Sequence, residues 1–226
     1  MFGGDRTQPM RDARYRDRHE AGQLLGRELA RRLGSTNDLI VLALPRGGVP
    51  VGSEVAKALN APLDVFIVRK LGVPGHEELA MGAIASGGVR VINRDVLGWL
   101  PLPQKAIDQV AEREQQELER REREYRGSRP PLDVRNKTVI VVDDGLATGS
   151  TMRAAVEALR KMLPRAIIVA VPVAAPQTCD EFRNEGIDLV CLRTPEPFEA
   201  VGLWYDDFSQ TTDEEVHEIL QQPAHD

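Results

Sequence analysis

The chain has 226 residues, of which 42% are hydrophobic and 28% charged, and its formal net charge is -6. These values are ordinary for a globular protein, and the length suits one sizeable core, so we expect a single domain over residues 1–226. No run of about eighteen apolar residues is present, which argues against a membrane protein. The negative charge argues against broad nucleic-acid binding, although a local basic patch still suits phosphate groups.

The N-terminal segment predicts a cytoplasmic location. Residues 1–18 are polar and rich in arginine, and they lack the apolar stretch that a secretory signal requires. We expect residues 1–16 to form a flexible tail. Cys179 and Cys191 are the only cysteines, too few for a disulfide framework or a zinc cluster, so two reduced thiols are expected.

The order of the predicted elements indicates an α/β fold. An amphipathic helix is predicted over residues 17–34, and short apolar runs of strand length follow it at 39–44, 63–68, 138–142, 166–171 and 188–192. Helical patterns lie between several of these runs, at 49–59, 150–163 and 177–184. This alternation predicts a mainly parallel sheet with helices on both faces.

One segment departs from the alternation. Residues 104–125 are almost wholly charged or polar, and their apolar stripe consists of Ile107, Val110, Ala111, Leu118 and Tyr125. We therefore predict a long charged helical insertion over residues 103–126. It either lies lightly on the domain as a solvated helix, which we favour, or packs against a second subunit, so a homodimer stays open.

The most informative segment, residues 139–151, combines a buried strand, two acids, a loop of small residues and a helix start. Such a loop directs backbone N–H groups and the hydroxyls of Thr148, Ser150 and Thr151 towards one point. The helix N-terminus adds partial positive charge there, which predicts a phosphate cradle.

The two acids next to the cradle, Asp143 and Asp144, need a different partner. Their carboxylates would repel a phosphate, so they are expected to face the diol of a sugar or a metal ion beside it. A phosphorylated ribose meets both demands. A loop that merely caps a helix would not explain two consecutive acids at the end of a buried strand.

Two acids followed by a small loop ending in Thr-Gly-x-Thr resemble the phosphoribosyl pyrophosphate motif of type I phosphoribosyltransferases. A Walker loop needs Gly-Lys-Ser/Thr and a Rossmann fingerprint needs three glycines after the first strand, and neither is present. The resemblance implies an α/β fold with a small hood, Mg²⁺ as cofactor, and phosphoribosyl pyrophosphate and a small nitrogenous base as substrates. It also implies catalytic and metal-binding roles for Asp143 and Asp144, and binding of the 5′-phosphate by Ala147, Thr148, Gly149, Ser150 and Thr151.

A second loop, Arg46-Gly47-Gly48, follows the first predicted strand. Paired glycines let a backbone approach an anion closely, and an arginine neutralises it. The loop resembles the pyrophosphate loop of the family, in the form found in its xanthine-guanine branch.

A third segment begins with Arg69 and Lys70 and continues through a stretch rich in glycine and alanine to Gly88. It resembles the mobile loop of the family, in which a basic residue near the start contacts the pyrophosphate. Arg69 and Lys70 match that position, which gives them catalytic roles. The alternative is a pair of solvated charges at a strand end.

The last segment, residues 195–226, is expected to form a C-terminal hood or tail. Three aromatic residues lie within residues 204–208. Trp204 either stacks on the base or belongs to a hydrophobic anchor that docks the tail, and the two interpretations are equally supported.

The accepting base is not identified by these motifs. Many purine-specific members carry an aspartate at the position of Ala147, and adenine-specific members usually carry a glutamate where Ala80 stands. The predicted function is transfer of the ribose 5-phosphate moiety to a nitrogenous base with release of pyrophosphate. Two alternatives stay open: a non-catalytic protein that binds phosphoribosyl pyrophosphate, and an enzyme that acts on another phosphorylated ribose.

Overall fold

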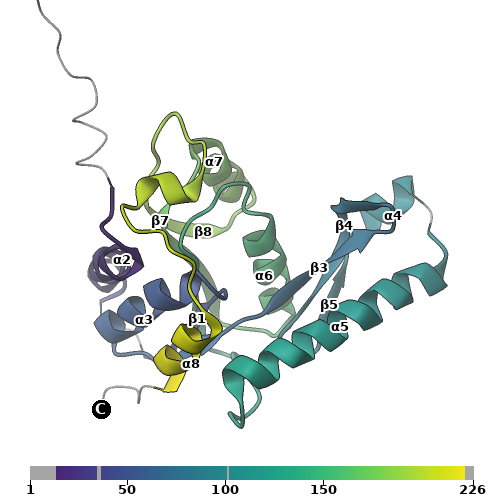
Figure 1. Cartoon of the computed structure of the whole chain (residues 1–226), viewed down its shortest axis with the longest axis horizontal. Coiled ribbons are helices and arrows are strands. Elements are labelled where there is room, and N and C mark those ends of the chain that lie inside the picture. Colours follow the sequence, from purple (N-terminus) through teal and green to yellow (C-terminus); the bar gives the residue numbers. More distant parts are fainter. Residues whose placement is uncertain (1–13, 35–36, 101, 222–226) are drawn as a thin grey trace, which may run out of the picture.

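The computed structural model describes residues 14–34, 37–100 and 102–221 and contains two β-sheets (Figure 1). Residues 1–13 of the predicted tail, 1–16, lie outside the described residues. Tyr15 corrects the prediction at the other end of that range, because it is fully buried and its hydroxyl donates to the carbonyl of Pro172. Cys179 and Cys191 are free thiols, as predicted. Within the described ranges, no helix combines the length and the apolar character needed to span a membrane.

The larger sheet has five strands in the order β2-β1-β6-β7-β8, and every neighbouring pair is parallel. The strands are β1 (Leu39–Ala43), β2 (Leu63–Val65), β6 (Thr138–Val142), β7 (Ala166–Val173) and β8 (Asp188–Arg193). β1 and β6 are buried along their whole length, as expected of central strands covered on both faces.

Helices cover both faces of this sheet. On one face, α2 (Arg18–Leu33) and α3 (Gly48–Leu59) pack against each other and against alternate residues of β6, Ile140 and Val142. On the other face, α6 (Ser150–Lys161) and α7 (Pro176–Asn184) cover Val139 and Val141. This confirms the predicted α/β fold with a parallel sheet flanked by helices.

The second sheet is antiparallel and consists of β3 (Val68–Val73), β4 (His76–Ala85) and β5 (Val89–Ile92), followed by α4 (Arg94–Trp99). It corrects two predictions, because the predicted strand 63–68 ends at Val65 and the segment predicted as a mobile loop is a β-hairpin. The glycines allow close packing of backbones within this sheet. A Cβ atom on Gly82 would lie 2.3 Å from the carbonyl oxygen of Val91.

The long charged helix is α5 (Gln104–Arg126), within one residue of its predicted end. It lies along the second sheet (Figure 1), and its whole predicted apolar stripe is buried in a cluster with Leu71, Val73 and Met81 of that sheet and with residues near the C-terminus, Val216, Ile219 and Leu220. The interpretation that the helix lies only lightly on the domain is therefore corrected. A thin apolar stripe is enough to cover this sheet, because the sheet has only three strands.

The C-terminal segment contains the short helix η1 (Val201–Trp204) and α8 (Asp213–Gln221). η1 lies over the carboxyl end of β6, because a Cβ atom on Gly145 would lie 2.6 Å from Cγ1 of Val201. α8 contacts both α3 and α5. The segment thus forms a hood above the sheet and then joins the two parts of the molecule.

Candidate functional site

The predicted phosphate cradle lies between β6 and α6. Gly149 precedes α6 in the left-handed conformation, with φ 68° and ψ 8°, while the side chains of Thr148, Ser150 and Thr151 are exposed. A Cβ atom on Gly149 would also lie 2.6 Å from the ring of Phe182, so both its conformation and its surroundings require glycine. The loop therefore presents hydroxyls at a helix N-terminus, which is an arrangement suited to an anion.

Side chains of neighbouring helices hold this loop from behind. The hydroxyl of Thr178 on α7 donates a hydrogen bond to the carbonyl of Ala147. The guanidinium of Arg153 on α6 donates to the carbonyl of Thr148 at 2.6 Å. The loop is thus oriented by contacts that leave its hydroxyls facing outwards.

The Arg46-Gly47-Gly48 loop lies beside the acid pair, because β1 and β6 are adjacent parallel strands and their carboxyl ends share one edge. A Cβ atom on Gly47 would lie 2.1 Å from Oδ2 of Asp144, and one on Gly48 would lie 2.7 Å from the carbonyl of Val142. The peptide bond between Pro45 and Arg46 is cis. The structure therefore brings together the two loops that the sequence indicated.

The two carboxyl groups between these loops are largely buried and close to each other. The backbone N–H of Asp144 donates to Oδ1 of Asp143 at 2.9 Å. Burial, together with the neighbouring charge of Asp144, raises the pKa of Asp143 well above its usual value. Burial also raises the pKa of Asp144, against the opposing effect of Arg18, whose Nε lies 2.9 Å from Oδ2. Such a pair favours a ligand that brings positive charge or hydroxyl donors.

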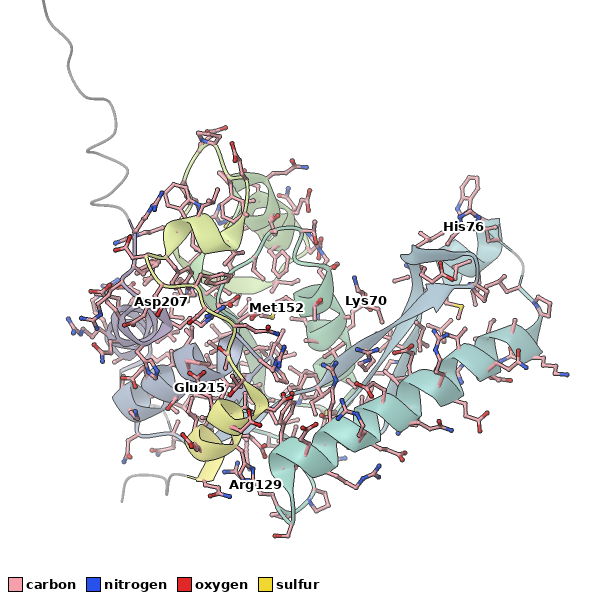
Figure 2. All side chains as sticks on the ribbon, viewed as in Figure 1. Lys70, His76, Arg129, Met152, Asp207 and Glu215 are labelled. Carbon is pink, nitrogen blue, oxygen red and sulfur yellow. The ribbon has the colours of Figure 1, made fainter. Side chains whose placement is uncertain are left out.

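The two basic residues at the start of β3 point in opposite directions, as successive residues of a strand do. Nζ of Lys70 lies 3.4 Å from Oγ of Ser150 in the cradle, and Figure 2 shows Lys70 between β3 and α6. Arg69 instead pairs with Glu114 of α5, with Nη2 2.6 Å and Nε 2.9 Å from Oε2. Only Lys70 of the two predicted residues therefore reaches the cradle in this structure.

Trp204 packs inside the hood and is 7% exposed, in a cluster with Tyr15, Ala21, Val173 and Tyr205. This is the packing of a hydrophobic anchor, one of the two interpretations that the sequence left open. His76 lies at the far end of the second sheet (Figure 2) and so adds nothing to the cradle.

Several residues of the site were not found from the sequence. Arg18 pairs with Asp144, and the hydroxyl of Tyr205 donates to the backbone carbonyl of Asp144 at 2.6 Å. Glu114 holds Arg69. No local pattern identifies these contacts, because their partners lie far away in the sequence. The sequence signal for Glu114 is its position between Ala111 and Leu118, on the apolar stripe of α5.

Asp143 and Asp144 are the candidate ligands for Mg²⁺ at this site. The described residues contain no group of three or more His, Cys, Asp or Glu side chains placed to hold a metal. Mg²⁺ usually keeps several waters and takes one or two carboxylates together with substrate phosphates. Asp143 and Asp144 fit that pattern, so they suit an ion that arrives with its substrate.

Comparisons with known proteins indicate one family. The model of the phosphoribosyl transferase domain matches residues 14–202. Proteins from two strains of Mycobacterium tuberculosis, described provisionally as phosphoribosyl transferases, are 43% identical over 212 residues. That match covers 94% of this chain and 47% of theirs, so the chain spans about half the length of these curated relatives.

Solved structures extend the match. The crystal structure of TT1426 from Thermus thermophilus is 42% identical with a TM-score of 0.83, covering 92% of this chain and 97% of that one. The AQ2163 protein from Aquifex aeolicus, 13% identical with a TM-score of 0.51 over 98% and 96% of the two chains, shares the fold alone. The chain therefore belongs to the phosphoribosyl transferase domain family, as its motifs predicted.

Proposed function

We propose that the chain transfers the ribose 5-phosphate moiety of phosphoribosyl pyrophosphate to a nitrogenous base and releases pyrophosphate. One observation carries the proposal: a buried acid pair lies between two glycine-containing loops at the carboxyl ends of adjacent parallel strands. Phosphoribosyl pyrophosphate has the same order of groups, with a phosphate at one end, a diol in the middle and a pyrophosphate at the other end.

Each part of the substrate then binds to a different group of residues. Residues 147–151 hold the 5′-phosphate through backbone N–H groups and hydroxyls. Asp143 and Asp144 accept hydrogen bonds from the ribose hydroxyls. Arg46 and Lys70 neutralise the pyrophosphate, and Gly47 and Gly48 let the backbone approach it closely. The pairing of Arg69 with Glu114 supports a structural role for Arg69 instead.

The reaction forms a bond between a ring nitrogen and carbon 1 of the ribose, with inversion, and a proton carried by that nitrogen passes to solvent. The bond from carbon 1 to the pyrophosphate oxygen breaks, and the pyrophosphate leaves with the electron pair. Positive charge develops on the ribose in the transition state, and the carboxylates of Asp143 and Asp144 stabilise it. Mg²⁺, when bound with the substrate by these two residues, supplies charge neutralisation for the pyrophosphate.

A second candidate function is binding of phosphoribosyl pyrophosphate without turnover. The observation that favours it is that two groups expected to act on the substrates are engaged elsewhere. Arg69 is held by Glu114, and Trp204 is packed within the hood. A protein that only binds the sugar phosphate needs neither group.

The test replaces both acids by asparagine, which keeps their shape and removes two negative charges. Release of pyrophosphate is first measured with the wild-type protein, phosphoribosyl pyrophosphate, Mg²⁺ and a panel of purines, pyrimidines and related bases. With an accepted base, the Asp143→Asn, Asp144→Asn variant is expected to bind phosphoribosyl pyrophosphate but to lose turnover by at least about a hundredfold. The matched control carries the same change at two exposed aspartates, Asp38→Asn and Asp180→Asn, and is expected to keep full activity.

Two results would contradict parts of this proposal. Unchanged turnover in the Asp143→Asn, Asp144→Asn variant would remove the proposed mechanism. Binding of phosphoribosyl pyrophosphate by the wild-type protein, without pyrophosphate release for any base, would favour the binding function.

A further inference from the structure

Arg18, the first residue of α2, links three parts of the molecule through one guanidinium group. Its Nε lies 2.9 Å from Oδ2 of Asp144, and its Nη1 donates to the backbone carbonyl of Ser209 at 2.7 Å. The guanidinium carbon lies 3.9 Å from the centroid of the Phe208 ring. The side chain is 11% exposed, so these contacts form in a largely desolvated position.

The hood reaches the same aspartate by a second route. The ring of Tyr205 lies 5.1 Å from that of Phe208, and its hydroxyl donates to the backbone carbonyl of Asp144 at 2.6 Å. Asp144 is therefore held at its side chain by Arg18 and at its main chain by Tyr205. Both of these partners contact Phe208, so α2, the hood and the acid pair form one connected group.

This arrangement fixes the direction in which Asp144 presents its remaining oxygen. Oδ2 is engaged by Arg18, whereas Oδ1 receives no side-chain donor from the part of the chain that the structure describes. The carboxylate lies directly against the backbone of Gly47, which leaves it little room to rotate. A diol is recognised well only when both acceptors are held in place before it binds.

We propose that Arg18 is a positioning residue. It holds Asp144 in the orientation in which the acid pair recognises the ribose diol, and it connects Asp144 to the hood. The inference rests on the proposed function, because it assumes that Asp143 and Asp144 meet the ribose hydroxyls. It does not require the accepting base to be known.

The experiment compares the affinities of three ligands by calorimetry: inorganic phosphate, ribose 5-phosphate and 2-deoxyribose 5-phosphate. The wild-type protein is expected to prefer ribose to 2-deoxyribose 5-phosphate by about tenfold, the worth of one hydrogen bond to a charged acceptor. Arg18→Ala is expected to bring that ratio to within about twofold of unity while leaving phosphate affinity nearly unchanged. Arg18→Lys is expected to restore part of the ratio, because lysine keeps the charge but lacks the planar fork.

Arg27→Ala is the matched control, since Arg27 is an exposed arginine on the same helix. It is expected to keep the wild-type ratio. A merely structural role of Arg18 would lower the affinities for all three ligands together and leave the ratio intact. Should Arg18→Ala not fold, as judged by circular dichroism, Arg18→Gln keeps part of the packing on Phe208 and is expected to lose the ratio likewise.

The outcomes separate the two proposals. A folded Arg18→Ala or Arg18→Gln protein that keeps the full ratio overturns the positioning role and leaves the proposed function standing. A wild-type protein that binds phosphate but does not distinguish the two sugars, or that binds neither sugar, contradicts the proposed function itself and the inference with it.

Discussion

Replacement of Gly47 by alanine tests how tightly the two substrate loops are packed. The backbone of Gly47, with φ -58° and ψ -30°, suits any residue, so the substitution introduces no conformational strain. Its whole effect comes from the new methyl group, which would lie 2.1 Å from Oδ2 of Asp144. To reach ordinary contact at 3.4 Å, the carboxylate must move by about 1.3 Å, which disturbs its hydrogen bond with Arg18.

The expected loss of stability follows from those contacts. The side chains of Arg18 and Asp144 are 11% and 15% exposed, so solvent screens their interaction little. Loss of a charged hydrogen bond costs about 1.5–3 kcal/mol, and overpacking costs a further ~1–3 kcal/mol. The reduced freedom of the unfolded chain offsets about 0.4–1 kcal/mol. We expect Gly47→Ala to lower the free energy of unfolding by about 2–5 kcal/mol, or the Tm by about 5–15 °C.

Gly98→Ala is the matched control. The same methyl group at Gly98, in α4, would meet no atom within 4 Å, so this variant is expected to be as stable as the wild type or slightly more stable. Urea denaturation and thermal melts measure the stability of both variants. Calorimetry measures the affinity for phosphoribosyl pyrophosphate, which should be reduced in Gly47→Ala and unchanged in Gly98→Ala. If the free energies of unfolding of the two variants differ by less than about 0.5 kcal/mol, the packing argument is refuted.

Three further predictions concern the second sheet and α5. Lys70→Gln should weaken the binding of phosphoribosyl pyrophosphate by about tenfold with little change in Tm, whereas Arg69→Gln should lower the Tm and change the affinity less. Calorimetry measures the affinity and thermal melts the Tm. The reverse result would contradict the assigned directions of the two side chains. Leu118→Ala, at a fully buried position, should lower the free energy of unfolding by about 2–5 kcal/mol in urea denaturation. Leu163→Ala, at a position 57% exposed, should lower it by less than about 1 kcal/mol. Similar losses in the two variants would show that α5 does not cover a hydrophobic core. Burial and a neighbouring carboxylate raise the pKa of Tyr125 to about 12, so its phenol stays protonated in the fold. Its contribution to stability is complete below about pH 10 and is lost between about pH 10 and 12, and Tyr125→Phe should remove that part of the decline in stability curves measured against pH.

The sequence predicted the parts of the site that depend on local pattern. The strand, acids, loop and helix over residues 139–151 are adjacent in the chain, and each has its own compositional signal. The same holds for the Arg46-Gly47-Gly48 loop, because a buried apolar run before it marks a strand. The structure makes β1 and β6 neighbours, so the carboxyl ends of these parallel strands share one edge and the two loops meet there.

The glycine-rich segment after Lys70 misled the sequence interpretation. Glycine is equally compatible with a flexible loop and with close packing of strands, and only the pairing of β4 with its neighbours distinguishes the two. The direction of Arg69 and Lys70 was undetermined for the same reason. Adjacent strand residues face opposite ways, and which face meets α5 depends on tertiary packing.

Trp204 and Arg18 show what only the tertiary structure decided. The sequence left Trp204 between a base platform and an anchor, and the cluster with Tyr15 at the other end of the chain supplies the packing of an anchor. Arg18 lies 126 residues from Asp144, and a charge pair at that separation leaves no periodic or local trace in a sequence. Glycines, hydroxyl residues and the spacing of apolar residues indicate the conformation of their own segment. The partner of a buried charge depends instead on which segments the fold brings together.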